Sequence, residues 1–206
     1  MQSQLHPPEI LVYDLGNVLV DFDWMIVIKR LAQKTGKTIS DFQQLLTNPK
    51  LLYDYEAGEI TTQEFFNRVQ NLIGYPNSLD DFRYDFGDMF TEAIQMTQLQ
   101  KKIRASGIPT FILSNTNEIA IDFIKDKFPF FDNFDGYVFS YEEKSMKPNV
   151  SIYRAIEKIS GKSGNQIAFI DDNIENIEGA IQLGWSAQQH VSFESTKDFF
   201  RNLGLI

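Results

Sequence analysis

Three groups of polar residues have the side-chain types and the spacing needed for chemistry on an anion. Asp14 follows one apolar run, residues 114–117 read Ser-Asn-Thr-Asn after a second run, and Asp171 and Asp172 stand side by side after another. A single aspartate or serine after an apolar run is more often a turn or capping residue than part of a site. Three such groups in one chain favour a shared site.

Carboxylates and one lysine narrow the chemistry of that site. Crowded carboxylates repel each other unless a proton or a cation lies between them. Ligands that are all oxygens indicate Mg²⁺, which binds one or two protein carboxylates and bridges to phosphate oxygens, and Asp14 and Asp172 suit that role. Lys147 precedes Pro148 where a helix is expected to begin, so its ammonium group and nearby amides could hold phosphate. Taken alone, Lys147 is equally well explained as a structural residue.

Short apolar runs are expected to form the strands that position these polar groups. Four of them span residues 10–13, 110–113, 137–139 and 167–170, with a possible fifth at 186–191. Continuous apolar runs of this length are typical of strands buried on both faces of a parallel sheet. Helix-like stretches at 119–127 and 152–159 separate the later runs, which predicts an α/β fold with a doubly wound parallel sheet. Ligands bind outside the carboxyl ends of such strands, so the polar groups should converge there.

The segment from about residue 23 to residue 95 has helical patterning and no convincing strand. Gly36 and Gly74 are typical of helix ends, Thr61 and Glu64 of a capping box, and Phe82, Phe86 and Phe90 of a core-packing stripe that recurs every four residues. We therefore expect an inserted all-helical cap at residues 22–96. Residues 1–21 and 97–206 should form a Rossmann-like catalytic core.

Composition limits the class of protein. With 206 residues, 43% of them hydrophobic, and no cysteine, the chain is expected to have one core with one insertion, no disulfide, and a reducing, cytoplasmic setting. The net charge of -9 at pH 7 repels polyanions, so neither nucleic acid nor an acidic membrane surface is an expected partner. No stretch approaches the roughly 20 apolar residues of a membrane span. The oligomeric state is not predicted.

The polar groups also form four motifs in a definite order. They are Asp14-Leu-Gly-Asn-Val-Leu, Leu113-Ser-Asn-Thr-Asn, Lys147-Pro and Phe169-Ile-Asp-Asp-Asn, and the sequence from Asn176 to Gly184 reads as the helix that usually follows the fourth. In this order they resemble the haloacid-dehalogenase (HAD) superfamily over the whole chain, including the helical C1-type cap after the first motif. The first two motifs, together with Glu56-Ala-Gly-Glu-Ile, look most like bacterial α-glucose-1-phosphate phosphatases.

The resemblance implies roles for the motif residues in a magnesium-dependent phosphatase. Asp14 would be the nucleophile and form an aspartyl-phosphate intermediate. Ser114 and Lys147 would hold the transferring phosphoryl group. Asp14, Asp172 and the backbone carbonyl of Gly16 would bind Mg²⁺, with Asp171 in direct or water-mediated support.

The resemblance also implies a small phosphorylated metabolite as substrate, such as the sugar phosphate glucose 1-phosphate. Trp24, Tyr55 and Glu56 in the cap are expected to contact the sugar, because aromatic and acidic groups suit polyols. Glu56 is equally well explained as a turn residue before Gly58. Asn115 and Asn117 in the second motif are further candidates for substrate binding.

One departure from the family pattern keeps alternatives open. Gly16 stands where most phosphatases of the superfamily carry an acidic residue that serves as general acid and base, so a phosphate-binding regulatory protein without activity is an alternative. A metal-independent haloacid dehalogenase is another, although the pair Asp171 and Asp172 argues against it. Receiver domains of response regulators carry similar residues, but their motif order differs and they lack a helical insert. Lys144 is a second departure, because relatives usually have glycine there.

Overall fold

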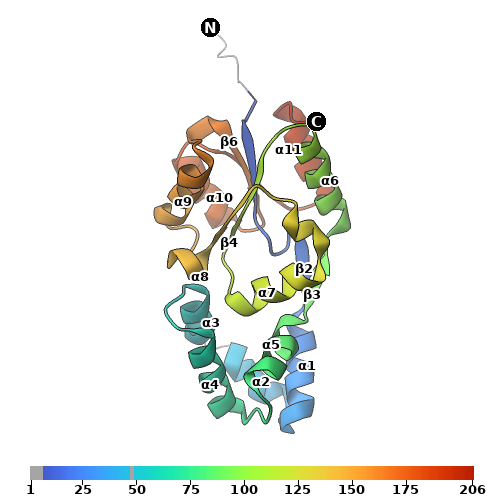
Figure 1. Ribbon diagram of the computed structural model, residues 1–206, viewed down its shortest axis with the longest axis vertical. Helices are drawn as coiled ribbons and strands as arrows, with labels where there is room; N and C mark the ends of the chain where they lie inside the picture. The colour runs from blue at the N-terminus through green and yellow to red at the C-terminus, as the bar shows by residue number, and fades with distance from the viewer. Residues whose placement is uncertain (1–6, 47–48) are drawn as a thin grey trace.

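The central sheet is built from short, fully buried strands. In the computed structural model, which describes residues 7–46 and 49–206, its strands are β1 (Ile10–Tyr13), β4 (Thr110–Ser114), β5 (Gly136–Phe139), β6 (Ile167–Asp171) and β7 (Ser186–Gln189). They form a five-stranded parallel sheet in the order β5-β4-β1-β6-β7 (Figure 1). Leu11 of β1 pairs with Thr110 of β4 on one side and with Ala168 of β6 on the other. The predicted doubly wound α/β fold is confirmed.

Helices cover both faces of this sheet. They are α6 (Ile94–Ala105), α7 (Glu118–Lys127), α8 (Ser140–Glu143), α9 (Val150–Ser160), α10 (Ile174–Gln182) and α11 (Phe193–Asn202), with 3₁₀ turns η1 (Pro129–Asp132) and η2 (Gly164–Gln166). Alternate residues of β1 serve different faces: Leu11 and Tyr13 pack in one cluster with α6, α7 and α11, and Ile10 and Val12 in another with α9 and α10. Successive side chains of a strand point to opposite faces of the sheet. A strand whose two faces are both covered by helices therefore has apolar residues at every position.

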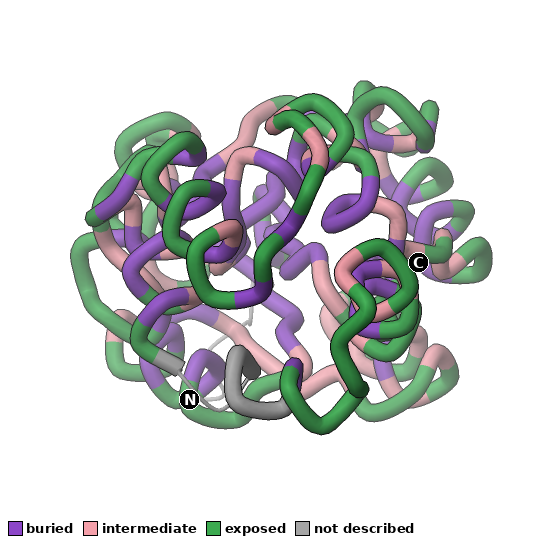
Figure 2. Tube along the Cα trace, turned by 90° about the horizontal axis from the view of Figure 1, so that it is seen from below, coloured by how far each residue is buried: buried purple, intermediate pink, exposed green. Residues whose placement is uncertain are grey.

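The segment between β1 and β4 contributes a separate helical unit. Its helices are α1 (Trp24–Thr35), α2 (Ile39–Leu46), α3 (Pro49–Glu56), α4 (Thr62–Ile73) and α5 (Leu79–Gly87). The predicted helix ends are present: Gly36 and Gly74 are left-handed C-caps, and Thr61 and Glu64 form a capping box. Phe65, Phe82 and their neighbours form a hydrophobic cluster of this unit, which Figure 2 shows as buried chain inside an exposed outer surface.

The prediction that this segment contains no strand is wrong. Phe90–Glu92 forms β3, which pairs antiparallel with β2 (Val20–Phe22) where the helical unit joins the core. The expected helical stripe therefore ends early: Phe82 and Phe86 are buried on α5, whereas Phe90 lies on β3. Three-residue strands are too short to show an alternating pattern. The domain boundaries at residues 22 and 96 fall within β2 and α6 and stay predictions, as does the role of the unit as a cap.

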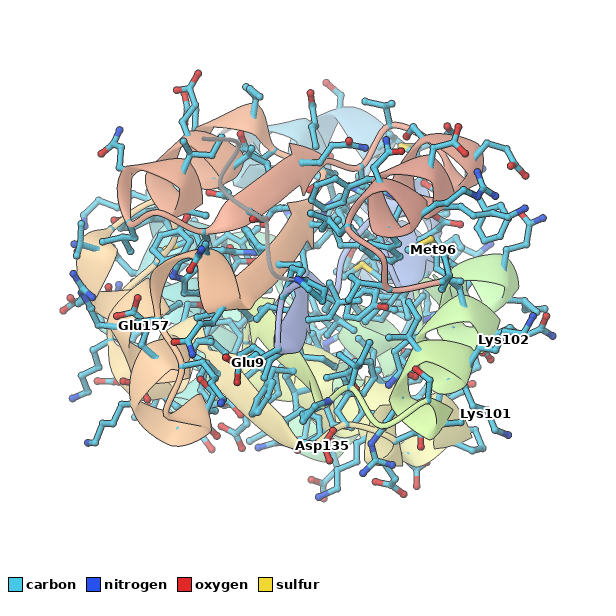
Figure 3. All side chains as sticks on the ribbon, turned by 90° about the horizontal axis from the view of Figure 1, so that it is seen from above. Glu9, Met96, Lys101, Lys102, Asp135 and Glu157 are labelled. Atoms are coloured by element: carbon cyan, nitrogen blue, oxygen red, sulfur yellow. The ribbon has the colours of Figure 1, made fainter. Side chains whose placement is uncertain are left out.

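The carboxyl ends of the parallel strands face the helical unit, and the amino ends lie at the opposite end of the molecule. Figure 3 looks onto that opposite end, where Glu9 precedes β1 and accepts a hydrogen bond of 2.7 Å from Gln166, and Asp135 precedes β5 and pairs with Arg104 at 2.9 Å. No helix in the described part of the chain combines the length and the hydropathy of a membrane span.

Lys144 ends α8 in a conformation that glycine adopts more easily. Its φ is 51°, and its backbone N–H closes the short helix on Ser140. The left-handed region costs a non-glycine residue roughly 1–2 kcal/mol. Lys144 therefore stands in a left-handed turn of the kind that the glycine usual at this position in relatives would form easily.

Candidate active site

Asp14 is fixed at the carboxyl end of β1 by the strand and by the loop that follows. Its backbone N–H donates to Ile170 O at 2.9 Å, and its Oδ1 accepts from the N–H of Leu15 at 2.7 Å. The chain then turns back at once, because the N–H of Val20 donates to Leu15 O at 3.0 Å. Asp14 is 8% exposed and therefore largely buried in the crevice at the carboxyl ends of the strands.

The ammonium group of Lys147 connects the first and fourth motifs. Its Nζ lies 2.9 Å from Asp14 Oδ1 and 2.5 Å from Asp171 Oδ2, and it donates to Leu113 O at 2.8 Å. The Lys147 side chain is 1% exposed. A buried ammonium needs such partners, because a charge without them is strongly disfavoured in a protein interior. Lys147 is therefore a fixed positive charge beside Asp14 rather than a surface residue.

Asp171 and Asp172 play different parts although they are adjacent. Asp171 is fully buried, and its Oδ1 accepts from the N–H of Asn173 at 2.8 Å and from Asn176 Nδ2 at 2.9 Å while its Oδ2 faces Lys147. Asp172 is half-buried, and its Oδ2 accepts from Asn17 Nδ2 at 2.8 Å. Asp171 thus holds Lys147 in place, and Asp172 turns toward the crevice.

These carboxylates form a group that can hold a metal ion. One oxygen each of Asp14, Asp171 and Asp172 lies within 4.8 Å of the others. The donor set consists of oxygens, which fits Mg²⁺ and not a soft metal. Since both oxygens of Asp171 already accept hydrogen bonds, Asp14 and Asp172 are the better placed direct ligands, with Asp171 supporting them.

Burial and charge control the protonation of the site. Burial first, and the Asp171 carboxylate second, raise the pKa of Asp14 to about 7, against the lowering effect of Lys147. Burial alone lowers the pKa of Lys147, but Asp14 and Asp171 outweigh it, so the pKa is raised and the ammonium keeps its proton. A bound divalent cation adds positive charge and favours ionised Asp14 at neutral pH.

The second motif supplies two hydroxyls and two amides at the end of β4. Ser114 is 2% exposed and lies at the edge of the crevice. The Asn115 side chain binds the backbone of Lys147 twice: its Nδ2 donates to Lys147 O at 3.0 Å, and its Oδ1 accepts from Lys147 N–H at 2.8 Å. Asn117 is the N-cap of α7, where its Oδ1 accepts from the N–H of Ala120 at 3.0 Å. The two asparagines therefore position backbone, although both line the adjoining pocket.

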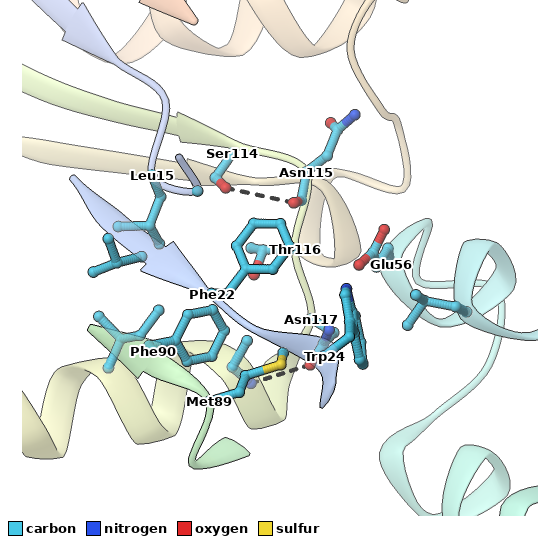
Figure 4. A pocket seen from close by; sticks show the side chains of 15 residues that line it. Leu15, Phe22, Trp24, Glu56, Met89, Phe90, Ser114, Asn115, Thr116 and Asn117 are labelled. Atoms are coloured by element: carbon cyan, nitrogen blue, oxygen red, sulfur yellow. Dashed lines mark hydrogen bonds between the residues drawn. The ribbon is translucent and has the colours of Figure 1, made fainter. Parts of the chain in front are cut away.

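A pocket of about 160 Å³ continues from this crevice toward the helical unit (Figure 4). Its lining consists of Leu15, Gly16, Val20, Phe22, Trp24, Leu52, Glu56, Met89, Phe90, Ser114, Asn115, Thr116, Asn117, Ala120 and Ile124. Trp24 and Glu56, expected to contact substrate, are both in it. Ser114 and Gly16 belong to the pocket and to the expected catalytic motifs, so the two regions are continuous.

Tyr55 is not among the residues that line the pocket. It is 2% exposed, stacks on Phe65 with ring centroids 4.3 Å apart, and its hydroxyl lies 2.8 Å from Thr62 Oγ1. The same hydroxyl accepts from the N–H of Ile119 at 3.3 Å. The structure places Tyr55 between the helical unit and α7, where it holds the two together, and not at the substrate pocket.

Glu56 is held over the pocket by close backbone contact with the core. Its carbonyl accepts from Ser140 Oγ at 2.5 Å. Gly58, at φ 68°, comes so near to α8 that a Cβ atom there would lie 2.2 Å from Tyr141 O, so a side chain at this position would push the two units apart. Burial raises the pKa of Glu56 to about 7, and a hydrogen bond from Asn117 opposes that rise.

Several residues of the site were not predicted from the sequence. Asn17 orients Asp172 and has φ 53°, a conformation that asparagine tolerates better than most residues, so its place after Gly16 was a usable signal. Phe22, Met89 and Phe90 line the pocket from β2, β3 and the chain before β3. No local pattern marked these three, because their place depends on the pairing of two short strands far apart in sequence.

A protein-family model described as haloacid dehalogenase-like hydrolase matches residues 9–184. The chain belongs to this family. The match confirms, at the level of the superfamily, the resemblance read from the four motifs. The finer resemblance to glucose-1-phosphate phosphatases is not tested by this match.

Two curated members of the family are similar along most of the chain. The sesquiterpene phosphatase astK of Aspergillus oryzae is 25% identical over 175 residues, which are 84% of this chain and 85% of the relative. The D-ribitol-5-phosphate phosphatase of Bacteroides thetaiotaomicron is 24% identical over 190 residues, which are 87% of this chain and 90% of the relative. Both are named as phosphatases, and their substrates differ widely.

Solved structures of the family share the fold. A HAD-family enzyme from Bacteroides thetaiotaomicron superposes with a TM-score of 0.78 at 26% identity, covering 89% of this chain and 93% of its own. The same enzyme was solved with magnesium and inorganic phosphate, with a TM-score of 0.77 at 26% identity, covering 88% of this chain and 93% of its own. These neighbours support the expected phosphatase class and the expected Mg²⁺ cofactor.

Proposed function

We propose that the protein is a Mg²⁺-dependent phosphatase that acts on a small phosphorylated metabolite through an aspartyl-phosphate at Asp14. The observation that carries the proposal is the geometry around Lys147, whose Nζ lies 2.9 Å from Asp14 Oδ1 and 2.5 Å from Asp171 Oδ2. This arrangement puts a nucleophilic carboxylate and a fixed positive charge together beside an oxygen-rich metal site. It suits transfer of a phosphoryl group, whose charge is spread over its oxygens.

In the first step Asp14 attacks phosphorus, the bond from phosphorus to the alcohol oxygen breaks, and the alcohol leaves with a proton. In the second step water attacks the aspartyl-phosphate, releases phosphate and restores Asp14. Lys147 and Ser114 hold the oxygens of the transferring group in both steps. Asp14, Asp172 and the carbonyl of Gly16 would hold Mg²⁺, which when bound neutralises charge on the phosphoryl oxygens.

Two alternatives are less well supported by the site. A haloacid dehalogenase attacks carbon without a metal and has no use for the carboxylate pair Asp171 and Asp172. The L-2-haloacid dehalogenase of Xanthobacter autotrophicus superposes with a TM-score of 0.65 at 18% identity, covering 93% of this chain and 81% of its own, which is a likeness of fold alone. A regulatory phosphate-binding protein would bind phosphate without turnover, so a measurement of activity separates it from the proposal.

The organic part of the substrate has two candidates. The motif resemblance and the D-ribitol-5-phosphate phosphatase relative support a sugar phosphate such as glucose 1-phosphate. The sesquiterpene phosphatase relative supports an apolar alcohol. Of the predicted contacts, Trp24 and Glu56 are available to either, because both line the pocket.

Removal of the metal tests the proposal directly. We expect hydrolysis of a small aryl phosphate to require Mg²⁺, to stop when a chelator is added, and to return when Mg²⁺ is restored. The reason is that Asp14 and Asp172 repel each other and the phosphate unless a cation lies between them. The measurement is release of inorganic phosphate. Undiminished turnover in the presence of chelator would rule out the metal-assisted mechanism.

Gly16 leaves the first step without its usual proton donor, and we propose that Glu56 takes that role. A Cβ atom on Gly16 would lie 3.1 Å from the ring of Phe22, so the ring occupies the space into which an acidic side chain would extend. Glu56 lines the same pocket, and its pKa of about 7 leaves much of it protonated at neutral pH. It is thus a carboxyl group that can donate a proton to a departing alcohol.

We expect Glu56→Gln to slow release of a basic alcohol by roughly 10²-fold or more, and release of 4-nitrophenol much less. Because the active form of Glu56 is protonated, the rate in the native protein should fall as the pH rises above about 7, and this fall should be absent in Glu56→Gln. Pre-steady-state release of alcohol across pH measures both effects. The exposed Glu59 gives the matched control, Glu59→Gln. If Glu56→Gln left the rates unchanged, or slowed release of the basic alcohol and of 4-nitrophenol equally, the proton would have to come from another residue.

A further inference from the structure

One side of the pocket is a continuous apolar wall. Phe22 and Phe90 come from the β2–β3 pair, Trp24 from the start of α1, and Leu52 from α3, and Met89 lies between α5 and β3 (Figure 4). The rings of this wall meet edge to face: ring centroids are 6.5 Å apart for Phe22 and Trp24 and 6.3 Å apart for Phe22 and Phe90. Such contacts fix the rings in place before any ligand arrives.

Phe22 is the most clearly exposed residue named on this wall. It lies at the end of the short strand β2 and is 37% exposed beside the crevice that holds Asp14. An exposed aromatic residue on a pocket wall gains free energy when an apolar group of a ligand covers it.

Three polar groups of the pocket lining are already engaged by the protein itself. Both ends of the Asn115 amide are bonded to the backbone of Lys147, and Asn117 caps α7 and donates to Glu56. The N–H of Thr116 donates to Ser140 Oγ at 2.9 Å. At these three groups a polyol would have to exchange its hydrogen bonds with water for partners that are already paired, which disfavours its binding there.

The size of the pocket sets a scale for the group that enters it. Its volume is about 160 Å³. A cavity of about 150 Å³ lined by apolar side chains holds a molecule of benzene. The pocket is therefore comparable in volume to a six-membered carbon ring or a branched chain of similar size.

We propose that the pocket receives the alcohol part of the substrate as an apolar group of this size, such as a branched five-carbon chain or a carbocycle, in preference to a sugar or polyol. The proposal rests on the proposed phosphatase function and names the substrate class of the same site. Ser114 and Asp14 take the phosphate end, and Phe22, Trp24 and Leu52 contact the alkyl group.

The test compares phosphate esters of primary alcohols, so that the acidity of the leaving group stays nearly constant. We expect isopentenyl phosphate and cyclohexylmethyl phosphate to have kcat/KM values roughly tenfold or more above those of ribitol 5-phosphate and glucose 6-phosphate. Equal values, or an advantage for the polyol esters, would overturn the assigned substrate class and leave the phosphatase function intact. Absence of turnover for every ester would overturn the function and this inference with it.

Variants of the wall locate the preference. Phe22→Ser and Leu52→Ser change wall residues from two different elements, β2 and α3, and each should lower the ratio of kcat/KM for isopentenyl phosphate to that for ribitol 5-phosphate by roughly tenfold, mainly through KM. Tyr53→Ser is the control, because Tyr53 neighbours Leu52 on α3 but is 56% exposed and outside the lining. An unchanged ratio in both wall variants, with native circular dichroism, would show that the wall does not contact the substrate.

Discussion

Asp14→Asn is expected to lower turnover by roughly 10⁴-fold or more, because the variant lacks the oxygen nucleophile on which both chemical steps depend. The measurement is single-turnover release of phosphate with saturating Mg²⁺. Native protein quenched in acid during turnover should carry a phosphoryl group on Asp14, which mass spectrometry of peptides detects, and the variant should carry none. Asp126→Asn changes an exposed aspartate on α7 and serves as the control. Near-native turnover in Asp14→Asn would show that Asp14 is not the nucleophile.

The same substitution should stabilise the metal-free protein. The folded state raises the pKa of Asp14 from 3.8 to about 7, so folding holds a proton that the unfolded chain releases. Stability of the native protein therefore falls as the pH rises from about 4 to about 7. Asparagine cannot ionise, so Asp14→Asn should gain roughly 2–4 kcal/mol at pH 8 and little near pH 4. Urea unfolding in chelator at the two pH values measures the difference, and saturating Mg²⁺ should reduce it.

The core of the fold was predictable because its signal is local. Every residue of β1 is buried, and a four-residue apolar run between polar residues leaves few other structures open to it. The candidate catalytic groups followed from the strands, since Asp14 directly follows β1 and Asp171 ends β6, and these strands are neighbours in the sheet. Parallel strands bring their carboxyl ends to one edge, so topology converts distant sequence positions into one site.

The substrate side was less predictable because it depends on contacts between units. Tyr55 was expected at the pocket from the resemblance and because aromatic groups suit polyols. Successive residues of a helix point in different directions, however, and of Tyr55 and Glu56 only Glu56 lines the pocket. Phe22 and Phe90 meet through the β2–β3 pair, which joins chain segments far apart in sequence. A pocket wall of this kind has no period in the sequence that could predict it.

Lys147→Met should cost both stability and activity, because the lysine compensates two buried carboxylates at once. Its side chain is 1% exposed, and its Nζ faces Asp14, Asp171 and Leu113 O. Removing one partner of a buried ionic group leaves the other charges uncompensated, which costs roughly 3–5 kcal/mol. Urea unfolding at pH 8 without metal measures this, and Lys144→Met, an exposed lysine three residues earlier, is the control. Turnover should fall by roughly 10²-fold or more with the loss of the fixed charge.

A double variant separates charge compensation from loss of packing. If the cost of Lys147→Met comes from Asp14 and Asp171 repelling each other, it should shrink by about 1 kcal/mol or more when Asp14→Asn is already present, because one of the two carboxylates is then neutral. It should also shrink well below pH 7, where the Asp14 carboxyl, whose pKa burial raises to about 7, holds a proton. A cost that is equal in both backgrounds and at both pH values would mean that Lys147 acts through the packing of its alkyl chain. In that case the buried ammonium would not be what allows two aspartates to share this crevice.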